Sequence, residues 1–174
     1  MALLSQEKVD LSSHRCRPLR VLSAEPTNRS KTMKTRINTY QIAGDAIGKL
    51  VGLHESLTAS FDNKLRHLID IRVSLMNDCQ FCLNMHTKEA LEGGDSEARV
   101  AALKHWQNSD LFDAREKAAL AWSDVLTRTG SQAEIDAVYG DLGAHFSKDD
   151  IGLMTVVVAH INAWNRIGIA SYVH

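Results

Sequence analysis

The residues best suited to chemistry lie close together, in the stretch NDCQFCLNMH at positions 77–86. It contains two of the three cysteines of the chain and one of its eight histidines, spaced as Cys79-x-x-Cys82-x-x-x-His86. Two thiols at this separation can act as a dithiol/disulfide couple, and the same three side chains are common zinc ligands. The spacing therefore allows three interpretations: a redox couple, a zinc site, or buried sulfur without a chemical role.

An α-helix that begins at this motif would place the three side chains on one face. Aspartate is a favoured N-cap residue, so we expect Asp78 to cap the helix and Cys79 to take its first position. At about 100° per residue, Cys79, Cys82 and His86 then lie within a stripe about 60° wide. The helix dipole stabilises a thiolate there, and we expect Cys79 to be the more acidic and more exposed thiol. This geometry favours a redox dithiol, in which one thiolate attacks and the other resolves the product.

A zinc site is the weaker alternative for the same residues. Cys79, Cys82 and His86 could occupy three positions of a tetrahedral site, and either His67 or His54 could supply the fourth ligand. Structural zinc sites usually draw a second pair of ligands from a separate knuckle, and the sequence has no second Cys-x-x-Cys. A sulfur pair carries two electrons by itself, so the redox interpretation predicts neither a metal nor an organic cofactor.

The chain as a whole has the composition of an ordinary globular domain, with 174 residues, 24% of them charged, and a formal net charge of −1. A charge so close to zero gives no electrostatic reason to expect nucleic acid or an anionic membrane as partner. No apolar run approaches the roughly 18 residues that a membrane span needs. The small number of cysteines is typical of a reducing compartment, and we therefore expect a cytoplasmic protein.

The composition changes near residue 33. Both prolines, Pro18 and Pro26, precede this point, as does a small excess of basic over acidic residues. The first segment has no apolar stretch of signal-peptide length, and its polar composition predicts a disordered N-terminal extension over residues 1–32. We expect residues 33–174 to form one domain.

The proline-free remainder predicts an all-α fold, since apolar residues recur at helical spacing and no strand alternation persists. Two helix starts carry capping-box signals: Ser131 is followed by Glu134, and Ser147 by Asp150. The expected helical segments are 39–52, 53–60, 63–76, 78–92, 97–106, 109–130, 131–146 and 147–173.

The stretch KLRHLIDIRVSLMNDCQFCLNMHTKEA, residues 64–90, resembles the carboxymuconolactone decarboxylase-like superfamily, and within it the AhpD-like alkylhydroperoxidases. The resemblance continues through residues 115–127 and 146–170, and covers roughly 33–172. It implies an all-helical fold that buries its dithiol, with the Cys-x-x-Cys motif at a helix N-terminus. It also implies a homo-oligomer.

The resemblance also suggests roles for individual residues. It implies that Cys82 is the peroxide-attacking thiolate, that Cys79 resolves the resulting sulfenic acid, and that His86 relays protons. Such proteins usually carry a glutamate twelve residues before the first cysteine, where this chain has His67. An imidazole with an ordinary pKa of about 6.5 could serve as a base in its place. Alternatively, the relay is broken and His67 has no catalytic role.

These observations predict a peroxiredoxin-type antioxidant enzyme. Its dithiol would reduce an organic hydroperoxide or hydrogen peroxide, and an external thiol or disulfide reductant would restore it. Two alternatives remain: an oligomeric redox sensor with an incomplete proton relay, which reacts once and stops, and a zinc-binding protein that uses Cys79, Cys82 and His86.

Overall fold

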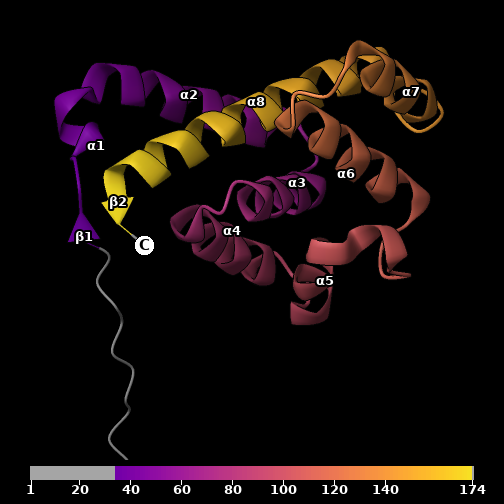
Figure 1. The fold of residues 1–174 in the computed structure, drawn as a ribbon, viewed down its shortest axis with the longest axis horizontal. Helices are drawn as coiled ribbons and strands as arrows, with labels where there is room; N and C mark the ends of the chain where they lie inside the picture. Colours follow the sequence, from indigo (N-terminus) through magenta and orange to yellow (C-terminus); the bar gives the residue numbers. More distant parts are fainter. Residues whose placement is uncertain (1–33, 174) are drawn as a thin grey trace, which may run out of the picture. The chain divides into compact units, whose positions relative to one another are not determined.

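The computed structural model describes residues 34–173, and helices dominate this part of the chain (Figure 1). The helices are α1 (Thr39–Ile42), α2 (Gly44–Ser60), α3 (Asn63–Met76), α4 (Gln80–Glu92), α5 (Glu97–Ala102), a 3-10 helix (Leu103–Asn108), α6 (Ala114–Thr127), α7 (Gln132–Leu142) and α8 (Lys148–Ser171). Within the described residues, the only strands are the short antiparallel pair β1 (Lys34–Thr35) and β2 (Tyr172–Val173). The all-α prediction is confirmed, whereas the expected disordered extension lies outside the described residues.

Side-chain caps fix several helix starts where the sequence predicts them. Ser131 and Ser147 both form capping boxes, with Glu134 and Asp150 respectively, and each begins a helix at the next residue. Asp113 forms a third capping box at the start of α6. Because this cap satisfies the first free N–H groups of α6, the helix begins at 114 rather than at the expected 109.

The first helical region divides at a different place from the one predicted. We expected a boundary after Gly52, but α2 continues through this residue, and the break lies at Ala43, whose φ of −117° and ψ of 37° are not helical. A glycine inside a helix costs only about 1 kcal/mol relative to alanine. Ile47 and Leu57, on either side of Gly52, are both buried, and such tertiary packing offsets a cost of this size.

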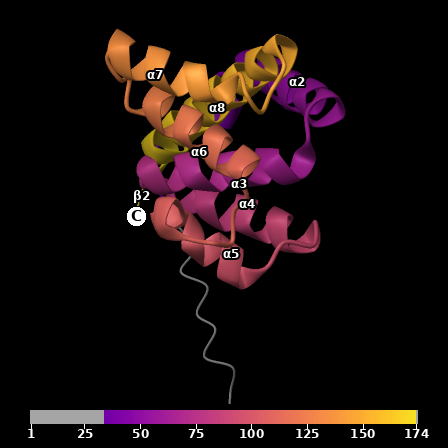
Figure 2. The ribbon, with the colours of Figure 1, turned by 90° about the vertical axis from the view of Figure 1, so that its right-hand side faces the viewer.

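Helix α3 forms the centre of the fold. It packs against α4, α6 and α8, and lies between α4 and α6 in the view of Figure 2. Five of its apolar residues are almost completely buried: Leu65, Leu68, Ile69, Ile71 and Val73. The two helices that carry the candidate site, α4 and α8, therefore rest on a common support.

An interior ion pair ties α3 to α6. Arg72 donates two hydrogen bonds to the carboxylate of Asp124, from Nε at 2.7 Å and from Nη2 at 2.8 Å. The indole Nε1 of Trp106, in the 3-10 helix, also donates to Asp124, at 3.3 Å. Paired guanidinium and carboxylate groups of this kind fix geometry as well as energy, so the orientation of α3 is well defined. Of the described helices, none is long and apolar enough to cross a membrane.

Candidate redox site

The turn between α3 and α4 sets the position of both cysteines. Asp78 has a φ of +53°, in the left-handed region, and belongs to the end of α3 rather than to the start of α4. Cys79 is therefore the N-cap residue of α4, and the predicted capping role of Asp78 is wrong. The physical reason is that the chain reverses direction within three residues, which takes one left-handed residue directly after the α3 C-cap.

A buried polar network holds this turn against α8. The side-chain amide of Asn77 donates to Asn165 Oδ1 at 2.8 Å, and Asn165 Nδ2 donates to Ser74 Oγ at 3.1 Å. The Cys79 backbone N–H donates to the Ser74 carbonyl at 3.0 Å. Asn165 and Ser74 are fully buried, so these bonds are shielded from competing water.

The sulfur atoms of Cys79 and Cys82 lie at disulfide-bonding distance, with their Cα atoms 5.4 Å apart. Both residues are buried, at 0% and 2% exposed respectively, so the expectation of an exposed Cys79 is wrong. Helix α8 covers the pair through Gly168. A Cβ atom at this position would lie 3.0 Å from Cys79 Sγ and 3.2 Å from Cys82 Sγ. The backbone of α8 can approach the sulfurs this closely only because position 168 carries no side chain.

A cavity of about 480 Å³ is lined by Cys82 but not by Cys79. Its apolar walls come from Tyr40, Val51, Phe81, Met85, Trp164 and Tyr172. Its polar lining consists of His54, His86 and Glu89. A small molecule in this cavity would therefore meet Cys82 first, in apolar surroundings with an imidazole and a carboxylate nearby.

His86 is buried between two carboxylates. Its Nδ1 lies 2.9 Å from Glu89 Oε2 and 3.7 Å from Asp70 Oδ2, while its Nε2 is buried with no hydrogen-bond partner among the described residues. Burial lowers the pKa of His86, but Asp70 and Glu89 outweigh it, and the pKa is raised above its ordinary value of 6.5. The hydrogen bond from His86 lowers the pKa of Glu89, which is therefore an ionised acceptor.

The side chain of His67 lies apart from this cavity. Arg66 Nη2 donates to His67 Nε2 at 3.1 Å, and Arg66 Nη1 donates to Asp70 Oδ2 at 2.8 Å. His67 thus connects to His86 through Arg66 and Asp70, in place of a direct hydrogen bond. Burial and the neighbouring guanidinium lower the pKa of His67, so it is neutral near pH 7.

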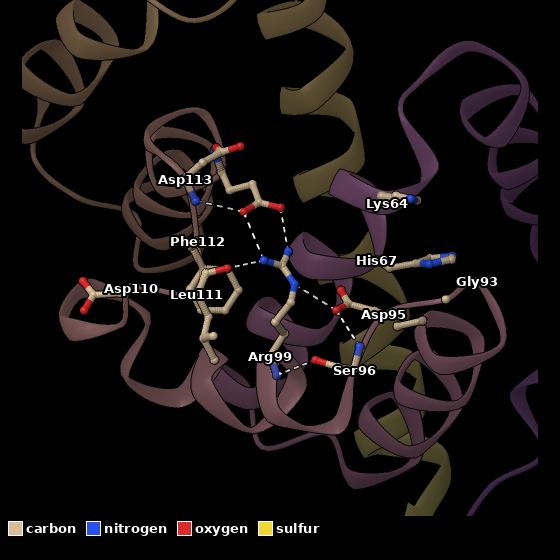
Figure 3. A pocket seen from close by; sticks show the side chains of 13 residues that line it. Lys64, His67, Gly93, Asp95, Ser96, Arg99, Asp110, Leu111, Phe112 and Asp113 are labelled. Carbon is tan, nitrogen blue, oxygen red and sulfur yellow. Dashed lines mark hydrogen bonds and ion pairs between the residues drawn. The ribbon is translucent and has the colours of Figure 1, made fainter.

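A second, polar cavity of about 540 Å³ is lined by His67 (Figure 3). In Figure 3, His67 and Lys64 border it on one side, and Arg99 lies at its centre. Arg99 forms ion pairs with Asp95 and Glu116. Arg99 already has carboxylate partners at 2.9 Å and 2.6 Å, so this cavity offers no free guanidinium to a ligand.

The structure thus brings together Cys79, Cys82 and His86, and places His67 in a neighbouring cavity. Sequence reasoning missed Asp70 and Glu89. Glu89 could have been found, since it follows His86 by three residues and Cys82 by seven, on the same helical face. Asp70 comes from another helix, so only the packing of α3 on α4 reveals it.

The residues named for zinc do not form a metal-binding arrangement. In the described part of the chain, no group of three or more His, Cys, Asp or Glu side chains is placed to hold a metal ion. His54, the possible fourth ligand, stacks on His160 with ring centroids 5.6 Å apart. His160 in turn accepts a hydrogen bond from Trp164 Nε1 at 2.7 Å, which fits a structural role for this histidine.

Comparison with known proteins identifies the fold and its relatives. The uncharacterized protein YdfG of Bacillus subtilis is 34% identical over 139 residues, which span 79% of this chain and 95% of YdfG. A crystal structure from Agrobacterium tumefaciens, of a protein of unknown function with a suggested role as the antioxidant defence protein AhpD, is 34% identical. It superimposes with a TM-score of 0.74 over 78% of this chain and 94% of its own.

A more distant structure shares the fold. It is an uncharacterized peroxidase-related protein from Silicibacter, 23% identical, with a TM-score of 0.65 over 73% of this chain and 68% of its own. The sequence model of the carboxymuconolactone decarboxylase family matches residues 49–124, the segment that contains α3, α4 and both site cysteines. Together with the relatives above, this match shows that the chain belongs to the carboxymuconolactone decarboxylase family, with AhpD-like architecture.

Proposed function

We propose that this protein is a thiol-dependent peroxidase that reduces organic hydroperoxides or hydrogen peroxide. The observation that carries the proposal is that the cavity reaches one cysteine of the buried pair: Cys82 lines it together with His86, whereas Cys79 does not line it and lies within disulfide-bonding distance of Cys82. The antioxidant role suggested for the Agrobacterium relative supports the same function. A reducing cytoplasm would keep such a dithiol ready for reaction.

The proposed cycle balances in electrons and atoms. His86 accepts the proton of Cys82, and the thiolate attacks one peroxide oxygen, so that the O–O bond breaks and the alkoxide leaves as alcohol after taking up a proton. Cys82 is then a sulfenic acid. The Cys79 thiolate attacks its sulfur, water leaves, and the disulfide forms. Two thiols of an external reductant return the electrons through a mixed disulfide and become a disulfide themselves.

In this cycle we propose roles for the other predicted site residues, supported by their positions. His86 is the proton relay, because its Nε2 has no hydrogen-bond partner among residues 34–173 and it lines the same cavity as Cys82. His67 would influence the reaction only through Arg66 and Asp70, which leaves it a minor modulator.

We also propose that the protein works as a homo-oligomer. Helices α1 and α2 carry several exposed large apolar side chains: Ile42 in α1, and Val51 and Leu53 on either side of the buried stripe of α2. Helix α2 packs mainly on α8. A cluster of exposed apolar residues next to a functional cavity is typical of a protein–protein contact.

The test begins with reduced, chelator-treated Cys16→Ser protein, which leaves only the two site cysteines. We expect one equivalent of cumene hydroperoxide to remove two hydrogens from the intact mass, and a peptide map to link Cys79 to Cys82. Continued peroxide consumption with a thiol regenerant would then separate an enzyme from a sensor that reacts once.

Three results would contradict the proposal. An unchanged mass with both thiols free would exclude peroxide reduction by the dithiol. A single turnover in the presence of excess thiol would favour the redox sensor. One equivalent of zinc in protein purified under reducing conditions, before chelation, would favour the metal site.

A further inference from the structure

We propose that Glu89 is the carboxylate that positions and charges His86, so that Cys82, His86 and Glu89 form a thiol–imidazole–carboxylate triad on a single helix. This inference rests on the proposed peroxidase function, because it assigns the proton relay of that site. It also explains how the site can dispense with a glutamate at position 67.

The spacing of the three residues favours this arrangement. Positions 82, 86 and 89 lie at 0°, about 40° and about −20° around the axis of α4, on one narrow face. All three line the same cavity. Since they are held by one continuous helix, their relative positions do not depend on the packing of another element.

The hydrogen bond between His86 and Glu89 fixes the tautomer of the imidazole. An ionised carboxylate can only accept, so Nδ1 carries the hydrogen and donates to Glu89 Oε2 at 2.9 Å. The lone pair of neutral His86 is then on Nε2, the buried atom without a partner among the described residues. This nitrogen is free to accept the thiol proton of Cys82, as the middle residue of a triad does.

Other charges around His86 come from three further helices. From α3, Asp70 faces Nδ1 at 3.7 Å and also helps to raise the pKa of His86, but the same oxygen is bound to Arg66 at 2.8 Å and makes no hydrogen bond to the imidazole; His67 lies beyond Arg66. From α2 and α8, His54 and His160 stack on each other near the cavity.

Within residues 34–173, the only ion pair of Glu89 is with His86, so its charge is not shared with an arginine or lysine. Glu89 is also 37% exposed at its side chain, so it can exchange a proton with water. When Cys82 passes its proton to Nε2, the imidazolium lies beside a full negative charge at Glu89. Glu89 thereby favours the thiolate–imidazolium pair over the neutral pair.

The test compares Glu89→Gln with a matched variant, Glu92→Gln. Glutamine keeps the size of the side chain and an acceptor for Nδ1, but removes the charge. Glu92 lies one turn further along α4 at 66% exposure, and its partner is Lys88, so its replacement removes the same charge away from the site. Two titrations are measured: the His86 imidazole by NMR, and the Cys82 thiolate by ultraviolet absorbance in a Cys16→Ser, Cys79→Ser background.

We expect Glu89→Gln to lower the pKa of His86, to move thiolate formation at Cys82 to higher pH, and to lower kcat/KM for cumene hydroperoxide by about tenfold or more in the protein with both site cysteines. Glu89→Asp should show smaller changes in the same directions. Glu92→Gln should change neither the pKa of His86 nor the pH at which the Cys82 thiolate forms. If both titrations of Glu89→Gln match the wild type, the inference is overturned, whatever the peroxide activity. If the wild type reduces no peroxide but Glu89→Gln still shifts both titrations, the inference stands and the proposed function fails.

Discussion

At the scale of single residues, the site depends on an absent side chain as much as on its reactive ones. Gly168 lets α8 cover the two sulfurs, and it belongs to a helix in which most other positions carry a Cβ. The motif predicts Cys79, Cys82 and His86 from local spacing alone. Gly168 lies 86 residues beyond Cys82 in the sequence, so no local pattern connects them, and only the packing of α8 on α4 does.

Replacement of Gly168 by alanine should disturb the dithiol directly. The new Cβ would lie 3.0 Å from Cys79 Sγ, closer than ordinary contact, so α8 or α4 must shift. Overpacking of this kind costs about 1–3 kcal/mol. We expect a lower Tm and slower oxidation of the dithiol by peroxide, measured by calorimetry and by the free-thiol count.

Gly152→Ala is the control for this prediction. Gly152 belongs to the same helix, and a Cβ there would meet nothing within 4 Å. Alanine is the better helix former by up to about 1 kcal/mol, so Gly152→Ala should raise the Tm slightly and leave the thiols reactive. If the two replacements change the Tm and the oxidation of the dithiol equally, the contact between position 168 and the sulfurs has no influence on either quantity.

His67 should make the stability of the protein depend on pH. Its pKa in the folded state is lowered from 6.5, by burial first and then by Arg66. Well above pH 6.5 both the folded and the unfolded states hold a neutral imidazole, and the group has no effect. As the pH falls below this value, the unfolded state takes up a proton that the folded state resists, so stability is lost.

His67→Gln removes this titration and keeps an acceptor for Arg66. We therefore expect the free energy of unfolding of the wild type to fall relative to that of the variant as the pH is lowered from about 7 to about 5. Urea unfolding at several pH values measures the difference. The exposed His105, replaced in the same way, serves as the control. A difference that is constant with pH would show that His67 titrates normally in the folded protein.

At the scale of helices and turns, the sequence predicts elements well where capping and periodicity agree. Helix α3 has the predicted bounds, 63–76, because Asp62 caps its start and the turn at 77–78 ends it. The capping boxes at Ser131 and Ser147 are equally local, and are found as predicted. The prediction is wrong at Asp78, where the demands of the turn outweigh the capping preference of aspartate. Such competition between two local rules depends on how α4 packs on α3, which single-sequence patterns do not contain.

At the scale of the whole molecule, the exposed apolar side chains of α1 and α2 lead to a prediction about assembly. Ile42 is 73% exposed and lies outside the set of residues that line the Cys82 cavity, so it can be changed without altering that lining. We expect the wild type to sediment as an oligomer of the 19.3 kDa chain and Ile42→Glu to shift toward the monomer, because a buried, unpaired carboxylate opposes association. Leu111→Glu is the matched control, since Leu111 is 46% exposed and lies between the 3-10 helix and α6, away from α1 and α2 in the sequence. Analytical ultracentrifugation over a range of concentrations measures the assembly of both variants.

A monomeric wild type would remove the oligomer from the proposal. An oligomer that Leu111→Glu disrupts and Ile42→Glu does not would move the interface to the side of the molecule that carries the second, polar cavity.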